Sequence, residues 1–264
     1  MPPSRRLGAV GYLNARPLTW ALDRDPKRWD IRYDLPAVCA SLLAGGDIDL
    51  GLVPSIEYLR SPSYRLIPGV GIGSRGPVGS VALYTRVPLN QVRRIGIDTS
   101  SRTSVALLRI LCRRRFEIDP EFVPHVPDLA AMTRAYEAGL LIGDPALEAN
   151  HAALGLIKID LGEEWTAMTG LPFIYAAWTG PSGQVSSADI DALQAAQEAG
   201  VHAFDEIAAE YGGNDPAMVA RAAVYLRDNM KYGLGAAESE GLQLFLDYAA
   251  DLGVAPSRRR LEYF

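Results

Sequence analysis

The stretch Gly8-Ala-Val-Gly-Tyr-Leu-Asn-Ala-Arg-Pro-Leu18 decides how the rest of the chain is interpreted. It begins with apolar residues typical of a short strand, breaks at Asn14-Ala-Arg-Pro17, and then opens a helical pattern. In open α/β sheets, ligands bind where a strand passes into a helix through a polar turn, because free backbone N–H groups and the helix dipole favour anions there. We therefore predict that Asn14 and Arg16 meet a ligand at the carboxyl end of this strand.

Three later segments repeat the order of strand, polar turn and helix. The predicted strand 47–53 runs into Pro54-Ser55, the strand 94–98 into the turn 99–104, and a buried strand after it into Gly143-Asp144. The turn 99–104 is rich in hydroxyl side chains and holds an arginine, which favours anion binding over simple helix capping. We expect Asn14 and these three turns to face a single cleft.

A glycine-rich connector precedes the strand that begins at Ser80. Gly71-Ile-Gly-Ser-Arg-Gly-Pro-Val-Gly79 has four glycines in nine residues, so its backbone can approach a ligand closely or adopt positive φ angles. A plain surface loop has the same composition. The sequence alone leaves both interpretations open.

Strands that alternate with helices predict an α/β fold with mostly parallel sheets. Two linker-like segments, near residues 85–91 and 179–185, divide the chain into two lobes with a ligand cleft between them. We expect residues 1–85 and 180–264 to form one discontinuous lobe, and residues 86–179 to form an inserted second lobe. Everything after Ser186 has helical spacing of apolar residues.

The composition excludes several classes of protein. The chain has 264 residues, 48% hydrophobic and 22% charged, with a net charge of −5, and its arginine clusters 113–115 and 258–260 are too short for a nucleic-acid footprint. No segment approaches the roughly 20 apolar residues of a membrane span, and no apolar signal region follows the first residues. We expect a cytoplasmic protein without nucleic-acid or membrane partners, in which Cys39 and Cys112 are reduced thiols.

The order of motifs resembles that of the chorismate dehydratase family, which has the two-lobed type II periplasmic-binding-protein fold and opens the futalosine route to menaquinone. The resemblance runs from about residue 7 to about residue 180. The segments that carry it are Gly11-Tyr-Leu-Asn-Ala-Arg-Pro-Leu18, Gly46-Asp-Ile-Asp-Leu-Gly-Leu-Val-Pro54 with Glu57-Tyr58, Gly76-Pro-Val-Gly-Ser80, Asp98 with Ser100, Thr103 and Ser104, Leu140-Leu-Ile-Gly-Asp-Pro-Ala-Leu147, and Thr169-Gly-Leu-Pro-Phe173.

The resemblance implies dehydration of chorismate to 3-enolpyruvylbenzoate without a metal or organic cofactor. The family residues that act on the substrate fall on Asn14 and Ser80. We expect the turn 99–104 to bind one carboxylate, and the Asn14 turn and the loop before Ser80 to contact the other carboxylate or the hydroxyl. The predicted substrate-binding residues are Arg16, Ser55, Gly79, Ser100, Thr103, Ser104, Asp144, Thr169, Gly170 and Phe173.

No general base is evident in these motifs. His125, His151 and His202 lie outside them, while Asp144 and Glu57 each have a plausible local structural role. One hypothesis needs no protein base, because the enolpyruvyl carboxylate of the substrate could take the proton. Tyr12, Trp165, Phe173 and Trp178 could line the cleft or belong to the core.

Three other functions remain open. The sister enzyme of the same route, dihydroxynaphthoate synthase, shares the fold but typically has Leu-Leu-Ile-His-Glu where this chain has Leu-Leu-Ile-Gly-Asp, so Gly143 stands in place of its histidine base. A solute-binding protein that only captures a small anion would have the same fold and the same turns. An effector-binding domain of a regulator would also fit, although no helix-turn-helix or basic domain accompanies it.

Overall fold

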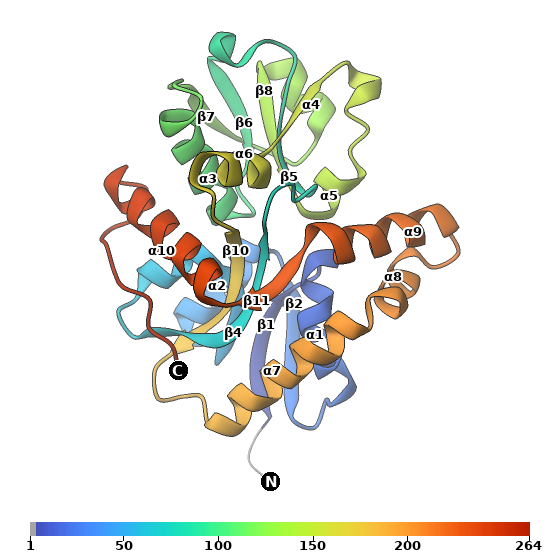
Figure 1. The fold of residues 1–264 in the computed structure, drawn as a ribbon, viewed down its shortest axis with the longest axis vertical. Helices are drawn as coiled ribbons and strands as arrows, with labels where there is room; N and C mark the ends of the chain where they lie inside the picture. Colours follow the sequence, from blue (N-terminus) through green and yellow to red (C-terminus); the bar gives the residue numbers. More distant parts are fainter. Residues whose placement is uncertain (1–3) are drawn as a thin grey trace.

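The structure is a computed structural model that describes residues 4–264. Two α/β lobes lie one above the other, each built around its own sheet, and the chain passes between them twice (Figure 1). The two-lobed α/β fold predicted from the alternation of strands and helices is confirmed.

The first lobe is built on a six-stranded sheet made of β1 (Arg5–Val10), β2 (Trp29–Asp34), β3 (Leu50–Pro54), β4 (Tyr64–Ser74), β10 (Phe173–Pro181) and β11 (Lys231–Leu234). The strand order is β11-β4-β10-β3-β1-β2. β1 is parallel to β2 and β3, whereas β10 is antiparallel to β3 and β4, and β11 is antiparallel to β4. β10 thus lies between β3 and β4 although it follows them by a long stretch of chain.

The second lobe is built on a five-stranded sheet made of β5 (Val81–Thr85), β6 (Arg94–Asp98), β7 (Glu121–His125), β8 (Ala138–Ile142) and β9 (Ile157–Asp160). The order is β7-β6-β8-β5-β9. β6 is parallel to β7 and β8, and β5 is antiparallel to β8 and β9. Both sheets are therefore mixed, which corrects the prediction of mostly parallel sheets. β5 and β10 enter their sheets from the other lobe, and no crossover helix sets their direction.

The predicted lobe boundaries at 85/86 and 179/180 each fall one strand too late. β5 pairs in the second sheet, and β10 pairs in the first. The chain crosses between the lobes in the loop 75–80 and again at 170–172. Both strands are buried apolar runs, so nothing in their own pattern shows which sheet they join.

Helices cover both sheets. In the first lobe they are α1 (Arg16–Thr19), α2 (Pro36–Gly45), α7 (Ser187–His202), α8 (Phe204–Gly212), α9 (Pro216–Val224) and α10 (Ala236–Asp251), with a π-helical segment η6 (Tyr225–Asn229) directly after α9. In the second lobe they are α3 (Arg102–Arg114), α4 (Leu129–Ala135), α5 (Gly143–Glu148) and α6 (Leu161–Thr169). Single turns of 3-10 helix are η1 (Leu13–Ala15), η2 (Leu22–Arg24), η3 (Ser55–Arg60), η4 (Leu89–Gln91) and η5 (Ala152–Leu154).

The prediction of an all-helical chain after Ser186 is wrong at β11 and over residues 253–264, which follow α10 without a helix. Residues 231–234 form β11, an edge strand whose side chains alternate between exposed and buried. This strand is too short to show a clear period in the sequence. Two helices, α7 and α8, meet at Ala203, and α7 begins with a capping box between Ser186 and Asp189.

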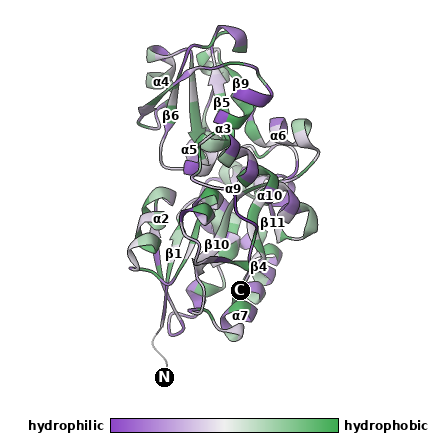
Figure 2. Cartoon of the chain, turned by 90° about the vertical axis from the view of Figure 1, so that its left-hand side faces the viewer, coloured by the Kyte–Doolittle hydropathy of each residue, from purple (hydrophilic) through white to green (hydrophobic). Residues whose placement is uncertain are grey.

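The lobes share a buried apolar core where the chain crosses between them. Trp165 of α6, Phe173 of β10 and Phe245 of α10 meet edge to face there, with ring centroids 5.2 Å and 4.9 Å apart for the pairs Trp165–Phe173 and Phe173–Phe245. Hydrophobic residues concentrate on the strands and on the helix faces that cover them (Figure 2). Within residues 4–264, no helix combines the length and apolar character needed to cross a membrane.

Candidate functional site

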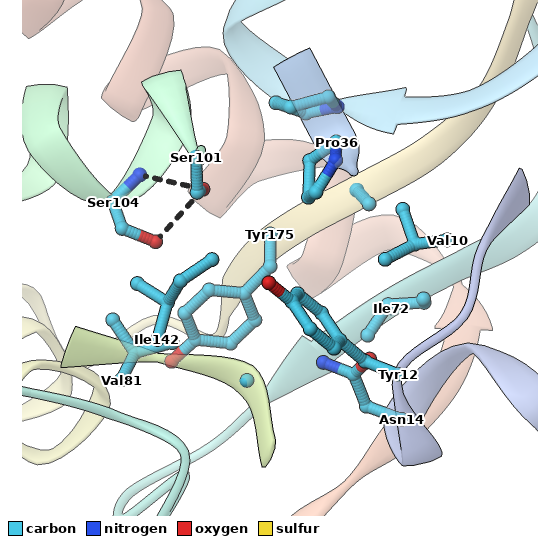
Figure 3. A pocket seen from close by; sticks show the side chains of 13 residues that line it. Val10, Tyr12, Asn14, Pro36, Ile72, Val81, Ser101, Ser104, Ile142 and Tyr175 are labelled. Carbon is cyan, nitrogen blue, oxygen red and sulfur yellow. Dashed lines mark hydrogen bonds between the residues drawn. The ribbon is translucent and has the colours of Figure 1, made fainter. Parts of the chain in front are cut away.

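A pocket lies between the two lobes, at the carboxyl ends of β1, β3 and β8 (Figure 3). Residues of both sheets and of the turns that follow these strands line it. They are Val10, Tyr12, Asn14, Pro36, Pro54, Ile72, Val81, Ser101, Ser104, Ile142, Gly143, Tyr175 and Ala176. The sequence located the cleft correctly, because it predicted that strand-end turns of both lobes would converge.

The turn after β1 carries Asn14 into this pocket. Asn14 is the middle residue of η1, and the backbone N–H of Leu13 donates a hydrogen bond of 3.0 Å to the Asp144 carboxylate of the other lobe. Burial raises the pKa of Asp144 above its usual value. Asp144 is therefore a tether between the lobes, and it does not line the pocket.

Gly143 shapes the pocket next to Asn14. Its φ angle is +61°, and a Cβ atom on this residue would lie 2.7 Å from the Tyr12 ring. Tyr12 therefore occupies the space that a side chain at position 143 would need. A side chain such as histidine at this position would require both the backbone and Tyr12 to move.

The start of α3 presents two hydroxyl groups to the pocket. Ser101 is the N-cap of α3, and its Oγ accepts a hydrogen bond from the Ser104 backbone N–H and lies 3.0 Å from Ser104 Oγ. Figure 3 shows this pair opposite the Tyr12 and Tyr175 rings. Ser104 was predicted as a contact, whereas Ser101 was missed as an individual residue within the hydroxyl-rich turn.

Two other predicted contacts in these turns are used inside the fold. Ser55 Oγ donates to the Ile174 carbonyl at 2.7 Å, and Thr103 Oγ1 accepts from the Ile56 backbone N–H at 3.1 Å. Both residues are buried away from the pocket lining. Ser100 also lies outside the lining, and its backbone N–H donates to Asp98 at 2.9 Å.

Ser80 lies behind the pocket wall. It is 1% exposed, it directly precedes the pocket-lining Val81, and its Oγ is 2.7 Å from the hydroxyl of Tyr225 in η6. Burial raises the pKa of Tyr225 above its usual value. Tyr225 was not predicted from the sequence, because a helical pattern does not show which distant element a side chain meets.

The glycine-rich crossing does not offer its backbone to a ligand at Gly79. The Asp160 carboxylate accepts hydrogen bonds from the backbone N–H groups of Val78 and Gly79, at 3.0 and 2.7 Å. It also caps α6 by accepting from Gly162 and Glu163. The Gly79 N–H therefore bonds to Asp160 and is not free to bind a ligand. This geometry does not support the prediction that Gly79 binds the substrate through its N–H.

The remaining predicted contacts lie elsewhere. The Arg16 guanidinium carbon lies 5.1 Å from the centroid of the Tyr211 ring, over which it stacks. Arg16 lines a different pocket, together with Trp20 and Arg24. Phe173 is fully buried in the aromatic core, while Thr169 and Gly170 end α6. The motif around residues 169–173 thus forms the second crossing between the lobes, and its residues do not line the pocket.

The lining of the pocket is mainly apolar, and its polar groups carry no charge. Among the lining residues that the structure describes, none is Asp, Glu, His, Lys or Arg. Burial raises the pKa values of Tyr12 and Tyr175, so both phenols are neutral near pH 7. The site can donate hydrogen bonds and enclose a ring, but these side chains offer no base that titrates near neutrality.

The three histidines lie away from this lining. The rings of His125 and His202 contact the backbone carbonyls of Val126 and Glu198, and His151 packs beside the Tyr84 ring. Across residues 4–264, no three His, Cys, Asp or Glu side chains are grouped so that they could hold a metal ion.

Comparison with known proteins identifies the family. Residues 5–251 match the family model described as menaquinone biosynthesis. The chain belongs to the menaquinone biosynthesis family. One relative in this comparison is a protein named chorismate dehydratase from Thermus thermophilus, which is 31% identical over 95% of this chain and 96% of its own length.

Solved structures share the fold of this family member at low identity. A protein of Archaeoglobus fulgidus superimposes with a TM-score of 0.72 at 16% identity, over 94% of this chain and 97% of its own. The periplasmic aliphatic sulphonate binding protein of Escherichia coli superimposes with a TM-score of 0.67 at 18% identity, over 98% of this chain and 95% of its own. These likenesses confirm the periplasmic-binding-protein-like fold.

Proposed function

We propose that this chain is a carbon–oxygen lyase that dehydrates chorismate to 3-enolpyruvylbenzoate in menaquinone biosynthesis. Membership of the menaquinone biosynthesis family and the 31% identity to a chorismate dehydratase support the reaction. We place this biosynthetic step in the cytoplasm. The observation that carries the mechanism is the pocket lining, which offers hydrogen-bond donors and a ring-sized apolar wall but no ionisable base among its described residues.

The reaction removes a proton and a hydroxyl from neighbouring ring carbons of chorismate. The C–H bond beside the ether oxygen breaks, its electrons form a ring double bond, and the neighbouring C–O bond breaks to release water. Because the ring becomes aromatic, the products are strongly favoured. The enzyme therefore needs mainly to orient the substrate and to stabilise the charge that develops.

The substrate supplies the base in this proposal. Its enolpyruvyl carboxylate takes the ring proton, and the carboxylic acid formed in this way gives that proton to the departing hydroxide, which leaves as water. Asn14 donates a hydrogen bond to that carboxylate and holds it against the ring carbon. Ser101 and Ser104, together with the start of α3, bind the ring carboxylate. The Tyr12 ring and Gly143 form the wall beside the substrate ring.

Turnover of purified chorismate tests the function. We expect the protein to remove the diene absorbance of chorismate, with 3-enolpyruvylbenzoate and water as products identified by NMR and mass spectrometry. Asn14→Ala should lower kcat by about 100-fold or more, because it removes the donor to the substrate carboxylate. Binding of chorismate without turnover would contradict the enzyme and leave a solute-binding protein of the same fold.

The pH dependence of kcat tests the source of the base. A substrate carboxylate is ionised throughout the neutral range, and the described lining residues hold no group that titrates there. We therefore expect kcat to be flat from about pH 6 to about pH 9. A bell-shaped profile with a limb near pH 6.5 would point to a protein base and contradict this mechanism.

A further inference from the structure

Gly76 is bonded to both lobes at the first crossing between them. Its backbone N–H donates to Thr166 Oγ1 of α6 at 2.9 Å, and its carbonyl accepts from Ser74 Oγ of β4 at 3.2 Å. The φ angle of Gly76 is +91°, a conformation that residues other than glycine rarely adopt. The bonds at this one residue therefore fix how the chain leaves the first sheet and enters the second lobe.

Two hydroxyl groups in series connect Gly76 with the pocket. Tyr175 of β10 lines the pocket with its ring (Figure 3), and its hydroxyl lies 3.0 Å from Ser74 Oγ. Since the single hydrogen of the Ser74 hydroxyl is directed to the Gly76 carbonyl, the phenol is the donor in its bond with Ser74. Burial raises the pKa of Tyr175 well above its usual value, so this donor keeps its hydrogen near pH 7.

The first turn of α6 packs directly against these groups. A Cβ atom at Gly162 would lie 2.5 Å from the Tyr175 hydroxyl oxygen, 2.7 Å from Ser74 Oγ and 2.8 Å from the Gly76 carbonyl oxygen. Only a residue without a side chain lets the helix come this close. Ser74 is fully buried, so the two hydroxyl groups are enclosed where the lobes meet.

We propose that Tyr175 is a positioning residue of the reaction: its hydroxyl, acting through Ser74 on Gly76, sets the spacing between the pocket walls of the two lobes. The Tyr175 ring belongs to the wall of the first lobe, and Val81, which directly follows the crossing, belongs to the wall of the second. A substrate held between these walls has its reacting groups aligned at one spacing only. The inference rests on the proposed function and extends it to the crossing.

Tyr84 of β5 provides a matched control. It is fully buried, and its hydroxyl donates to the Ala146 carbonyl at 2.9 Å, within the second lobe and outside the pocket lining. Tyr84→Phe and Tyr175→Phe each remove one buried phenol donor and keep the ring. Both should therefore lower the urea midpoint of unfolding by a similar amount, whereas only Tyr175→Phe loosens the crossing.

Steady-state kinetics with chorismate provide the first test. We expect kcat to fall by about 3-fold to 10-fold in Tyr175→Phe and by about 10-fold to 30-fold in Ser74→Ala, which breaks both bonds, with KM changed by less than about threefold. Tyr175→Phe should have little further effect in a Ser74→Ala background, since both changes break the same connection. Tyr84→Phe should keep the kcat of the wild type. Wild-type kcat in Tyr175→Phe or Ser74→Ala, or an equal loss in Tyr84→Phe, would overturn the proposal.

Hydrogen exchange at the crossing, followed by NMR, provides a test that does not depend on turnover. The backbone N–H groups of Gly76 and Gly79 are bonded to side chains of the second lobe, so they exchange slowly while the crossing is fixed. We expect at least about threefold faster exchange in Tyr175→Phe and Ser74→Ala, and no change in Tyr84→Phe. If the wild type fails to convert chorismate while exchange still responds in this way, the proposed function is wrong and the connection from Tyr175 to the crossing holds. If exchange is unchanged in Tyr175→Phe, the connection is wrong whatever the activity.

Discussion

The turns after β1 and β3 have the same backbone arrangement, but only one of them places its polar side chain in the pocket. Both follow neighbouring parallel strands and form a turn of 3-10 helix. Each is tied to the second lobe by one backbone N–H, from Leu13 to Asp144 in the first case and from Ile56 to Thr103 in the second. Yet Asn14 lines the pocket, whereas Ser55 donates to a backbone carbonyl inside the fold.

The difference shows that a polar residue at the carboxyl end of a strand does not bind a ligand merely because of its position. A short serine hydroxyl is satisfied by the nearest carbonyl, while the longer amide of Asn14 reaches the cleft. A binding residue differs because its side chain still has donors or acceptors that are not bonded to other groups of the fold.

Removing the two side chains should produce the largest contrast. We expect Asn14→Ala to lower kcat for chorismate by about 100-fold to 1,000-fold, with the free energy of unfolding nearly unchanged. Ser55→Ala should leave kcat within about twofold and lower the free energy of unfolding by about 1 kcal/mol, because it removes a buried hydrogen bond. Kinetics and urea denaturation measure both. A large loss of kcat in Ser55→Ala at full stability would remove the distinction between the turns.

Filling the space beside the Asn14 turn should have the next largest effect. Gly143→Ala places a Cβ atom against the Tyr12 ring in a left-handed conformation, so we expect a loss of about 2–3 kcal/mol in stability and at least a tenfold fall in kcat. Gly155 also has a positive φ but nothing within 4 Å of its Cβ position. Gly155→Ala should cost only about 1 kcal/mol and leave kcat unchanged. Equal effects of the two substitutions on stability and kcat would show that the contact with the Tyr12 ring does not cause the loss at position 143.

Breaking the tether of the β3 turn should affect stability alone. Thr103→Val keeps the shape of the side chain but leaves the Ile56 N–H without its acceptor, which should cost about 1–3 kcal/mol. We expect kcat at saturating chorismate to stay within about twofold of the wild type. A fall in kcat that exceeds the loss of folded protein would mean that this turn also positions the substrate.

Changing the tether of the Asn14 turn should give a smaller, pH-dependent effect. Since burial raises the pKa of Asp144 above its ordinary 3.8, the folded protein binds this proton more tightly than the unfolded chain does. The wild type therefore loses stability as the pH rises from the pKa of Asp144 in the unfolded chain to its raised pKa in the folded protein. Asp144→Asn keeps an oxygen acceptor for Leu13 and does not titrate, so its stability relative to the wild type should improve from about pH 3 to about pH 7. Thermal unfolding at several pH values measures this, and a relative decline with rising pH would contradict it.

Much of the fold could be predicted because its signals are local. The strand that ends before Asn14 and the passage from β6 through the hydroxyl-rich turn into α3 both follow from patterns within a few residues. The lobe boundaries and sheet directions could not, because they depend on which distant strands pair. β5 and β10 look alike in sequence whichever sheet they join.

In the candidate site too, some residues could be predicted from the sequence and others could not. Asn14 and Ser104 were found because strand-end turns converge in this architecture. The sequence does not show that Asp160, at the end of β9, accepts the N–H of Gly79, so the use of this group inside the fold could not be predicted. The contact of Tyr225 with Ser80 was not predicted, because it joins two hydroxyl groups that lie far apart in the chain. Such contacts have no periodicity that a sequence could reveal.

The place of β10 between β3 and β4 also fixes an order of events during synthesis. The second sheet is complete once β9 has left the ribosome, and every strand that it needs is then available. The first sheet begins earlier but lacks its central strand until residues 173–181 emerge, and its edge strand β11 comes later still. The inserted lobe is therefore free to fold while the lobe that begins the chain waits, with the facing edges of β3 and β4 unpaired. A nascent chain stalled before β10 would expose those edges and would need protection from aggregation.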